Sequence, residues 1–467
     1  MSILPRRMRF YSARDIERLP QLQSLTPDDR LAMRVVARVF PFRVNNYVVE
    51  DLIDWGNVPD DPLFRLTFPQ RGMLDPWDFD RLSEAVRAEA PVEEVAAIVA
   101  GIRFGLNPHP AGQMLENVPS IHGEPVHGLQ HKYRDSVLIF PSHGQTCHAF
   151  CTYCFRWPQF ADMDGFKFAT DRTRRFLTYL REHDEVTDVL ITGGDPMIMS
   201  AARLAEYVEP LLGAGFEHIQ TIRIGTKSVA YWPYRFVSDG DADDVLRLFE
   251  RVVASDKHLA LMAHNTHWRE LSTPVARVAI RRIRSTGAEV RTQCPIVRHI
   301  NDDPGVWARM WKEQVRLGCI PYYMFVERNT GANQYFSVPL YRAWRVYRGA
   351  WLRLSGLGRT ARGPVMSAYP GKVLVEGVAD VHGERVFVLS MIQSRLADQV
   401  RRPFFALFDP DAVWLTDLVP AFGKDRFPFE REEEYRRDAH RHDGGSWRWK
   451  RSSPAHVLST RQQDGDA

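Results

Sequence analysis

The sequence of 467 residues is poor in cysteine, has little excess charge and contains no run of about 18 apolar residues. Five cysteines, with no apolar signal segment after Met1, argue against a secreted disulfide framework. The missing apolar run predicts that no helix spans a membrane. A net charge of +3 gives no reason to expect nucleic acid as the main partner. We therefore expect a protein of the reducing cytoplasm.

The composition, 44% hydrophobic and 25% charged residues, is typical of a globular protein. In the N-terminal region, residues 1–125, helices are predicted to start at Asp15–Leu19 and after the N-cap residue Thr26. A third helix is predicted over Glu93–Phe104. Loops are expected in two stretches rich in proline and glycine, 57–76 and 107–126. The region has no catalytic motif, so we interpret it as a helical cap or an oligomerisation region.

Three of the five cysteines, Cys147, Cys151 and Cys154, are spaced C-x₃-C-x₂-C. Soft thiolate ligands held this close favour an iron–sulfur cluster or zinc. A structural zinc site needs a closed set of four ligands. His148 could be the fourth only by folding back between its neighbours, and the chain has no second C-x₂-C. The remaining two cysteines stand alone and are interpreted as ordinary buried thiols, Cys294 and Cys319.

From about residue 136, short β-rich runs alternate with stretches of helical periodicity. The expected strands are Ser136–Pro141, Asp188–Thr192, His218–Gly225, His258–Ala263, Glu289–Val297 and Pro321–Val326. The expected helices are 171–182, 201–212, 241–254, 274–285 and 304–317. This alternation predicts an α/β fold with a right-handed parallel sheet, an open partial (β/α)₆ barrel. Chemistry in such barrels lies at the carboxyl ends of the strands, and the cysteines follow the first predicted strand.

Polar and glycine residues also follow other predicted strands. Gly193 and Gly194 could let a ligand approach the backbone closely, or form a tight turn in which Asp195 caps the next helix. His264 and His267 follow the fourth strand. No third metal ligand is evident near them, so hydrogen bonding to a ribose or a carboxylate is the favoured interpretation.

The cysteine spacing resembles the signature of the radical S-adenosylmethionine (SAM) superfamily. This resemblance implies that the three cysteines bind three irons of a [4Fe–4S] cluster, whose fourth iron chelates the amino and carboxylate groups of SAM. It implies an external electron donor such as flavodoxin or ferredoxin. It also implies that SAM is contacted by the aromatic ring of Tyr153, beside the adenine, and by Gly193, Gly194, Asp195, Arg223, Thr226 and His264.

Further stretches, in order from about residue 120 to 380, resemble the lysine 2,3-aminomutase family of radical SAM enzymes. The matching residues are His131–Asp135, Cys147–Arg156, Leu190–Asp195, Ile222–Thr226, His264–Glu270, Pro321–Tyr323 and Pro364–Met366. Several separated matches in order are harder to obtain by chance than any one of them. A small-molecule substrate is expected, and a homo-oligomer is left open.

The chain departs from the family at the pyridoxal phosphate (PLP) site. Family aminomutases hold PLP as an imine to a lysine just before Pro-Val-Met, and that position here is Arg362. A guanidinium stays protonated and cannot form the imine. The family arginines that grip the PLP phosphate are replaced by Lys132 and Ser136. We expect PLP to be absent; the alternative is a PLP-dependent amino-acid 2,3-aminomutase that uses another lysine, of which Lys372 is the nearest.

The substrate positions differ as well. Family members that act on lysine place two aspartates around its distal ammonium group, and the corresponding residues here are Arg328 and Ser355. The positive charge of Arg328 would repel an ammonium group. Arg156 is retained, and the resemblance implies that it pairs with a substrate carboxylate. The plainer interpretations of Arg156 are a surface salt bridge or a contact to the cluster loop.

The sequence therefore predicts a radical SAM enzyme in which Arg156, Arg328 and Arg362 face a small polar substrate, with isomerase, lyase and oxidoreductase chemistry all open. A non-catalytic iron–sulfur or zinc-binding protein is the second alternative. A hairpin is predicted from Lys372–Val378 and Arg385–Met391. The expected division is an N-terminal helical region, a radical SAM barrel, a C-terminal extension and a charged, flexible tail: 1–125, 126–350, 351–423 and 424–467.

Overall fold

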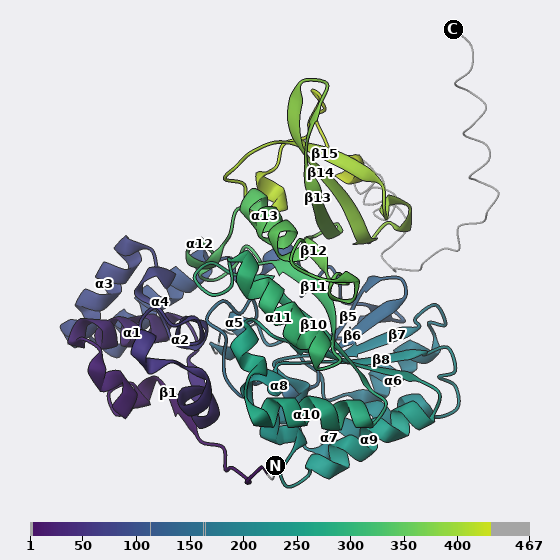
Figure 1. The fold of residues 1–467 in the computed structure, drawn as a ribbon, viewed down its shortest axis with the longest axis horizontal. Coiled ribbons are helices and arrows are strands. Elements are labelled where there is room, and N and C mark those ends of the chain that lie inside the picture. The colour runs from purple at the N-terminus through teal and green to yellow at the C-terminus, as the bar shows by residue number, and fades with distance from the viewer. Residues whose placement is uncertain (1–2, 113, 162, 164, 431–467) are drawn as a thin grey trace.

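The computed structural model describes residues 3–112, 114–161, 163 and 165–430 (Figure 1). Its centre is one sheet of eleven strands in the order β15-β14-β13-β12-β11-β10-β9-β8-β7-β6-β5. The predicted charged tail lies outside the described residues from 431 onward. No helix in the described part of the chain is long and apolar enough to cross a membrane.

Six consecutive parallel strands form the part of the sheet that the alternation in the sequence predicts. They are β6 (Ser136–Ile139), β7 (Asp188–Ile191), β8 (Thr221–Thr226), β9 (His258–His264), β10 (Glu289–Ile296) and β11 (Ile320–Val326). The intervening helices also lie where they were expected: α6 (Thr173–Arg181), α7 (Ala201–Val208), α9 (Ala242–Ala254), α10 (Pro274–Ser285) and α11 (Pro304–Arg316). The predicted fold class, an α/β partial barrel, is confirmed.

The strands of the barrel separate apolar from polar side chains. In β8, Ile222 and Ile224 are buried in the main core, whereas Arg223 and Gly225 alternate with them and line a cavity on the other side of the sheet. Figure 1 shows α7, α9, α10 and α11 along the outside of the sheet. The apolar positions therefore attach the helices, and the alternate positions are left to form the barrel interior.

The N-terminal region is largely helical, with α1 (Pro27–Val39), α3 (Pro76–Arg87) and α4 (Val92–Gly105). Thr26 caps α1 as predicted, since its side chain accepts a hydrogen bond from the Asp29 amide. The expected start at Asp15–Leu19 gives only a 3-10 turn, Ala13–Asp15. The expected loop at 57–76 is wrong in part, because Asp61 accepts hydrogen bonds from two amides and starts α2 (Pro62–Thr67).

The N-terminal region packs directly on the cysteine loop. The Phe150 amide donates to the Arg43 carbonyl at 2.8 Å, and the Thr152 amide donates to the Leu66 carbonyl at 2.9 Å. The Asn45 side-chain amide donates to the carbonyl of His148 at 2.9 Å. The N-terminal region is thus hydrogen-bonded to the backbone of the loop that carries the three cysteines.

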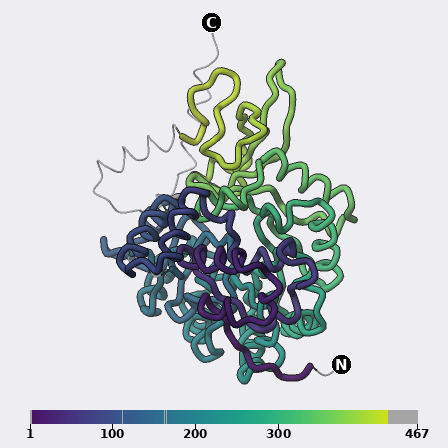
Figure 2. Tube along the Cα trace, turned by 90° about the vertical axis from the view of Figure 1, so that its left-hand side faces the viewer, coloured from purple at the N-terminus to yellow at the C-terminus, as the bar shows by residue number. Residues whose placement is uncertain are grey.

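Beyond the barrel, α13 (Leu340–Trp351) leads into four further strands of the same sheet. They are β12 (Arg362–Ser367), β13 (Gly371–Val381), β14 (Glu384–Ser394) and β15 (Pro403–Leu407). The predicted hairpin is β13 paired antiparallel with β14, and β12 pairs parallel with β11. Figure 2 shows this C-terminal part projecting from one end of the molecule. The proposed boundary at residue 350 falls within α13, and the same sheet continues on both sides of it, so the domain division stays a prediction.

We expect Asp61→Ala to lower the free energy of unfolding by about 3 kcal/mol, because it removes the cap of α2 and leaves Arg269 without its carboxylate partner. The Asp61 side chain is fully buried, and Arg269 belongs to the 3-10 turn Trp268–Leu271 of the barrel. Urea unfolding measures the loss. Asp28→Ala, on an exposed first turn of α1, is the control, and an equal loss in both variants would contradict the assignment.

Candidate active site

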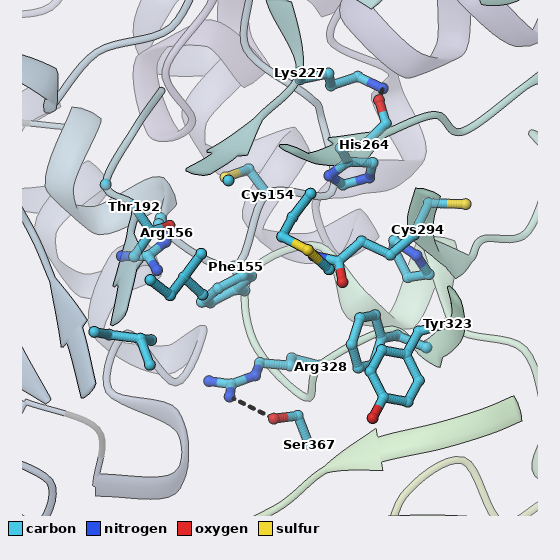
Figure 3. Close-up of a pocket in the computed structure, with 18 of the residues that line it drawn as sticks. Cys154, Phe155, Arg156, Thr192, Lys227, His264, Cys294, Tyr323, Arg328 and Ser367 are labelled. Carbon is cyan, nitrogen blue, oxygen red and sulfur yellow. Dashed lines mark hydrogen bonds between the residues drawn. The ribbon is translucent and has the colours of Figure 1, made fainter. Parts of the chain in front are cut away.

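A cavity of about 370 Å³ lies on the inner side of the parallel sheet (Figure 3). Residues from the ends of several strands and from the cysteine loop line it, among them Cys147, Cys151 and Cys154. The arrangement agrees with the expectation that the functional groups of a parallel barrel gather at the carboxyl ends of its strands.

Three thiols therefore converge on one cavity. Burial raises the pKa of each, that of Cys154 to about 12, so that a cation beside them would be needed to hold three thiolates. The part of the chain that the structure describes has no group of three His, Cys, Asp or Glu side chains placed around a single metal ion. The three thiolates of a cubane cluster bind three different irons, so they do not need to meet at one point. The residues present fit such a cluster.

His148 is not directed into this cavity. It is 2% exposed, and its Nδ1 lies 3.0 Å from the Ser228 hydroxyl oxygen. Burial lowers the pKa of His148 to about 3, so the ring is neutral. His148 therefore does not supply the fourth ligand that a zinc site would need.

Gly193 and Gly194 hold the backbone that precedes Cys147. A Cβ on Gly194 would lie 2.4 Å from the Thr146 carbonyl oxygen, and one on Gly193 would lie 2.5 Å from Nε2 of Gln145. Gly193 also has a φ of +153°. The amide of Gly194 donates to the Gly144 carbonyl at 3.0 Å. Both glycines line the cavity, so they form part of its wall and also leave room for the start of the cysteine loop.

Asp195 has the capping role that the sequence left open. Its carboxylate accepts hydrogen bonds from the Met197 amide at 2.9 Å, the Thr226 hydroxyl at 2.7 Å, the Lys227 amide at 2.9 Å and the Ser228 hydroxyl at 3.0 Å. The side chain is 2% exposed and is not among the cavity-lining residues. It joins the end of β7 to the end of β8 from behind the wall, which does not match the implied direct contact with SAM.

The other residues implied for SAM line the cavity: Tyr153, Arg223, Thr226 and His264. The Tyr153 hydroxyl lies 2.9 Å from Nε2 of His264 and 2.8 Å from the Thr266 hydroxyl. Burial keeps the pKa of His264 well below its usual value, with Lys227 as a second cause, so the imidazole is neutral. Arg223 forms a 2.6 Å ion pair with Asp188.

Arg156 and Arg328 lie against the same aromatic ring. Their guanidinium carbons are 5.1 and 4.6 Å from the centroid of Phe155, and Figure 3 shows that ring between them. Arg328 also donates to the Ser367 hydroxyl at 3.3 Å. Burial lowers the pKa of both arginines to about 10, so both remain cationic at pH 7. No carboxylate among the described residues forms an ion pair with Arg156.

Two residues expected beside the substrate do not line the cavity. Arg362 begins β12 and lies 4.6 Å from the centroid of the Tyr323 ring and 4.8 Å from that of Tyr322. It is a strand residue and not part of a loop. Ser355 is exposed and precedes the 3-10 turn Gly356–Gly358, so it does not join Arg328 as the second member of a substrate pair.

The sequence did not assign two cavity residues at all, Lys227 and Glu327. It named three others without placing them in this cavity: Tyr133 within a matching stretch, Cys294 as a buried thiol and Lys372 as the nearest alternative lysine. Lys227 forms a 2.7 Å ion pair with the buried Glu270. Glu327 is 6% exposed, and neither of its carboxyl oxygens has a partner among the described residues. Burial raises its pKa well above the usual value. A charged residue directly after a predicted strand was the signal that could have identified Glu327.

A parallel sheet with a C-x₃-C-x₂-C loop at its ligand-binding edge is the architecture of a radical SAM enzyme. An Aquifex aeolicus (strain VF5) protein, provisionally named an L-lysine 2,3-aminomutase, is 30% identical over 402 residues, 85% of this chain and 93% of that protein. The L-lysine 2,3-aminomutase of Fusobacterium nucleatum is 25% identical over 289 residues, 58% of this chain and 64% of that enzyme. The chain belongs to the lysine 2,3-aminomutase family of radical SAM enzymes, which implies a [4Fe–4S] cluster and SAM.

The other comparisons add little. Streptococcus suis SuiB, in a crystal structure with its precursor peptide SuiA, shows 12% identity over 61% of this chain and 60% of SuiB. Its TM-score of 0.35 is too low to support an argument. No family model matches the chain.

We expect Gly194→Ala to reduce iron binding, because the added methyl group would push the Thr146 backbone and displace Cys147. After anaerobic reconstitution the wild type should hold about four irons per chain, and the variant clearly fewer. Gly240→Ala is the matched control, since its Cβ would meet nothing within 4 Å. The thermal midpoint of each variant is recorded, and full iron content in a folded Gly194→Ala protein would refute this role of the glycine.

Proposed function

We propose that Cys147, Cys151 and Cys154 bind a [4Fe–4S] cluster in this protein, and that it acts with SAM on a small carboxylate-bearing substrate without PLP. The observation that carries the proposal is that all three cysteines line one cavity with Arg156 and Arg328. The reduced cluster and SAM together supply a 5′-deoxyadenosyl radical, which can remove a hydrogen atom from a substrate carbon. An external one-electron donor such as flavodoxin or ferredoxin would reduce the cluster.

The protein's own contribution is placement and the exclusion of water. The N-terminal region covers the cysteine loop through Asn45 and Arg43, and aromatic rings such as Phe150 and Phe155 line the cavity. In this scheme Tyr153, Arg223, Thr226, His264 and the two wall glycines contact SAM. Asp195 acts as a positioning residue that joins the strand ends behind them.

The substrate would be anionic. Arg156 and Arg328 are two cations on one aromatic ring, and the acidic residue that lines the same cavity, Glu327, has a pKa raised well above its usual value. Buried charges are normally paired, so a ligand carboxylate beside Arg156 would lower the electrostatic energy of the site. Lysine, with its distal ammonium group, is disfavoured next to Arg328. Isomerisation, elimination and oxidation all begin with the same hydrogen abstraction, and the proposal covers that shared step.

The family's PLP site does not fit PLP in this chain. Arg362 stands where the family has its imine-forming lysine, and it cannot supply a neutral amine. The Lys132 ammonium donates to the Ala368 carbonyl. Ser136, at a position where the family has a phosphate-binding arginine, has a short neutral side chain. One observation favours the second candidate function, a PLP-dependent aminomutase: Lys372, a lysine at another position, lines the cavity.

We expect Cys154→Ala to lose most of its iron and its ability to cleave SAM, because the cluster would have only two protein ligands. With dithionite and SAM, the reconstituted wild type should form 5′-deoxyadenosine slowly even without substrate, as measured by chromatography. Cys319→Ala is the control, since that buried thiol lies outside the cavity lining. Cluster-replete wild type that forms no 5′-deoxyadenosine would refute the radical SAM activity.

We expect protein purified from cells supplied with pyridoxine to release no stoichiometric PLP on denaturation, because Arg362 cannot hold it as an imine. The absorbance and fluorescence of the released cofactor measure this directly. A 1:1 amount of PLP would overturn the PLP-independent proposal and favour the aminomutase alternative.

A further inference from the structure

Lys372 is an enclosed amine in the wall of the candidate active site. It lies near the start of β13, directly opposite Gln393 of β14, and its ammonium donates to the Gln393 side-chain oxygen. The register of the two strands shifts between Lys372 and Val373. Such irregularities re-aim side chains and occur often beside active sites. Lys372 lines the same cavity as the three cysteines.

The surroundings of this amine are aromatic and cationic. Its Nζ lies 5.0 Å from the centroid of the Tyr323 ring and 5.5 Å from that of Tyr133. Burial first, then the charges of Arg223 and Arg362, lower the pKa of Lys372 to about 7. Asp188 acts in the opposite direction, but its carboxylate is paired with Arg223 at 2.6 Å. The Lys372 amine therefore loses its proton more readily than an exposed lysine does.

A second observation points to a ligand beside this amine. The hydroxyl of Tyr133 is buried and has no hydrogen-bond partner among the described residues. A buried hydroxyl without a partner costs roughly 1–3 kcal/mol, so a polar ligand atom next to Tyr133 would remove an unfavourable contribution. Arg328 is one of the charges that act on Tyr133. The phenol, the guanidinium and the amine thus border one part of the cavity.

We propose that Lys372 forms an imine with a carbonyl-bearing anion bound in this cavity, for example a 2-oxo acid or an aldehyde acid. The amine nitrogen attacks the carbonyl carbon, and its two protons pass to the carbonyl oxygen, relayed by the Tyr133 hydroxyl or by water. The oxygen then leaves as water, and the C=N bond forms. Atoms balance as amine plus carbonyl gives imine plus water, and no oxidant or reductant is needed. The anionic group of the ligand pairs with Arg328 or Arg156.

This inference deepens the proposed function and rests on it for the cavity's role as a substrate site. A carbon radical next to a C=N bond is delocalised into it. An imine formed by Lys372 would therefore give a substrate the stabilisation that PLP provides in other family members. The carbonyl group has two sources, a substrate or an aldehyde cofactor such as PLP, and the same lysine would react with either.

The test is reductive trapping on the full, anaerobically reconstituted protein with SAM. Glyoxylate, pyruvate and PLP are added separately with cyanoborohydride, and peptide mass spectrometry locates the reduced adduct. We expect the adduct at Lys372, its loss in Lys372→Arg, and its retention at Lys372 in Lys132→Gln. Lys132 is a matched control because its Nζ also lies 5.5 Å from the Tyr133 ring centroid.

The pH dependence separates an enclosed lysine from an exposed one. A protonated amine is not a nucleophile, so adduct formation at Lys372 should rise through pH 7 and level off above about pH 8. At pH 7 the neutral fraction of Lys372 should be roughly a thousandfold larger than that of a lysine with the usual pKa of about 10.4. Trace labelling at several pH values, read by peptide, measures this difference.

The possible results of the trapping experiment test different parts of the inference. Trapping of glyoxylate or pyruvate at Lys372 supports the imine, whereas trapping of PLP alone supports the imine and overturns PLP independence. Adducts only on exposed lysines, or a Lys372 profile with the midpoint of an exposed lysine, would overturn the inference. Formation of 5′-deoxyadenosine by the same wild-type preparation is measured in parallel, so that failure of the imine and failure of the cluster chemistry are distinguished.

Discussion

The candidate active site depends on the close approach of two backbone segments, the glycine pair after β7 and the start of the cysteine loop. Gly194 and its neighbour leave no room for a Cβ against Gly144–Thr146, and the carboxylate of Asp195 fastens this contact to the end of β8. The cysteine loop therefore begins from a fixed point on the sheet. The N-terminal region then contacts the other side of the loop through hydrogen bonds from the Asn45 side chain and to the Leu66 carbonyl. A flexible loop of eight residues would otherwise hold its three thiols in many arrangements, and only a few of those suit one cluster.

The barrel could be predicted from the sequence because each of its strands is a local apolar run followed by an amphipathic helix. The starts of short helices were harder to predict from the sequence. Asp61 lies in a proline-rich stretch, and it caps α2 only because its side chain accepts hydrogen bonds from the Leu63 and Phe64 amides. Strand β12 was missed because its pairing with β11 spans about forty residues of chain. Local periodicity carries no information about such a pairing.

In the candidate site, too, only the residues that are close in the chain could be grouped from the sequence. That Cys147, Cys151 and Cys154 lie together could be predicted from their spacing, because they are close in the chain, and all three do line one cavity. Lys372 reaches the cavity through an antiparallel hairpin whose register shifts beside it, and no pattern in the sequence reveals that shift. Ser355, the residue that the resemblance aligns with a substrate-binding aspartate, is exposed and lies outside the cavity lining, and that alignment stays a prediction.

The continuous sheet has a consequence for how this family could diversify. In the proposed function the cluster and SAM lie at the ends of β6 to β9, whereas Arg328 directly follows β11 and Lys372 lies in β13. Apart from Arg156, which follows the cysteines, the groups proposed to meet the substrate thus lie in the other half of the hydrogen-bonded sheet from the groups proposed to start the radical. An exchange of the C-terminal half between relatives would transplant substrate preference as a unit, provided that the β10–β11 edge kept its ladder of backbone hydrogen bonds.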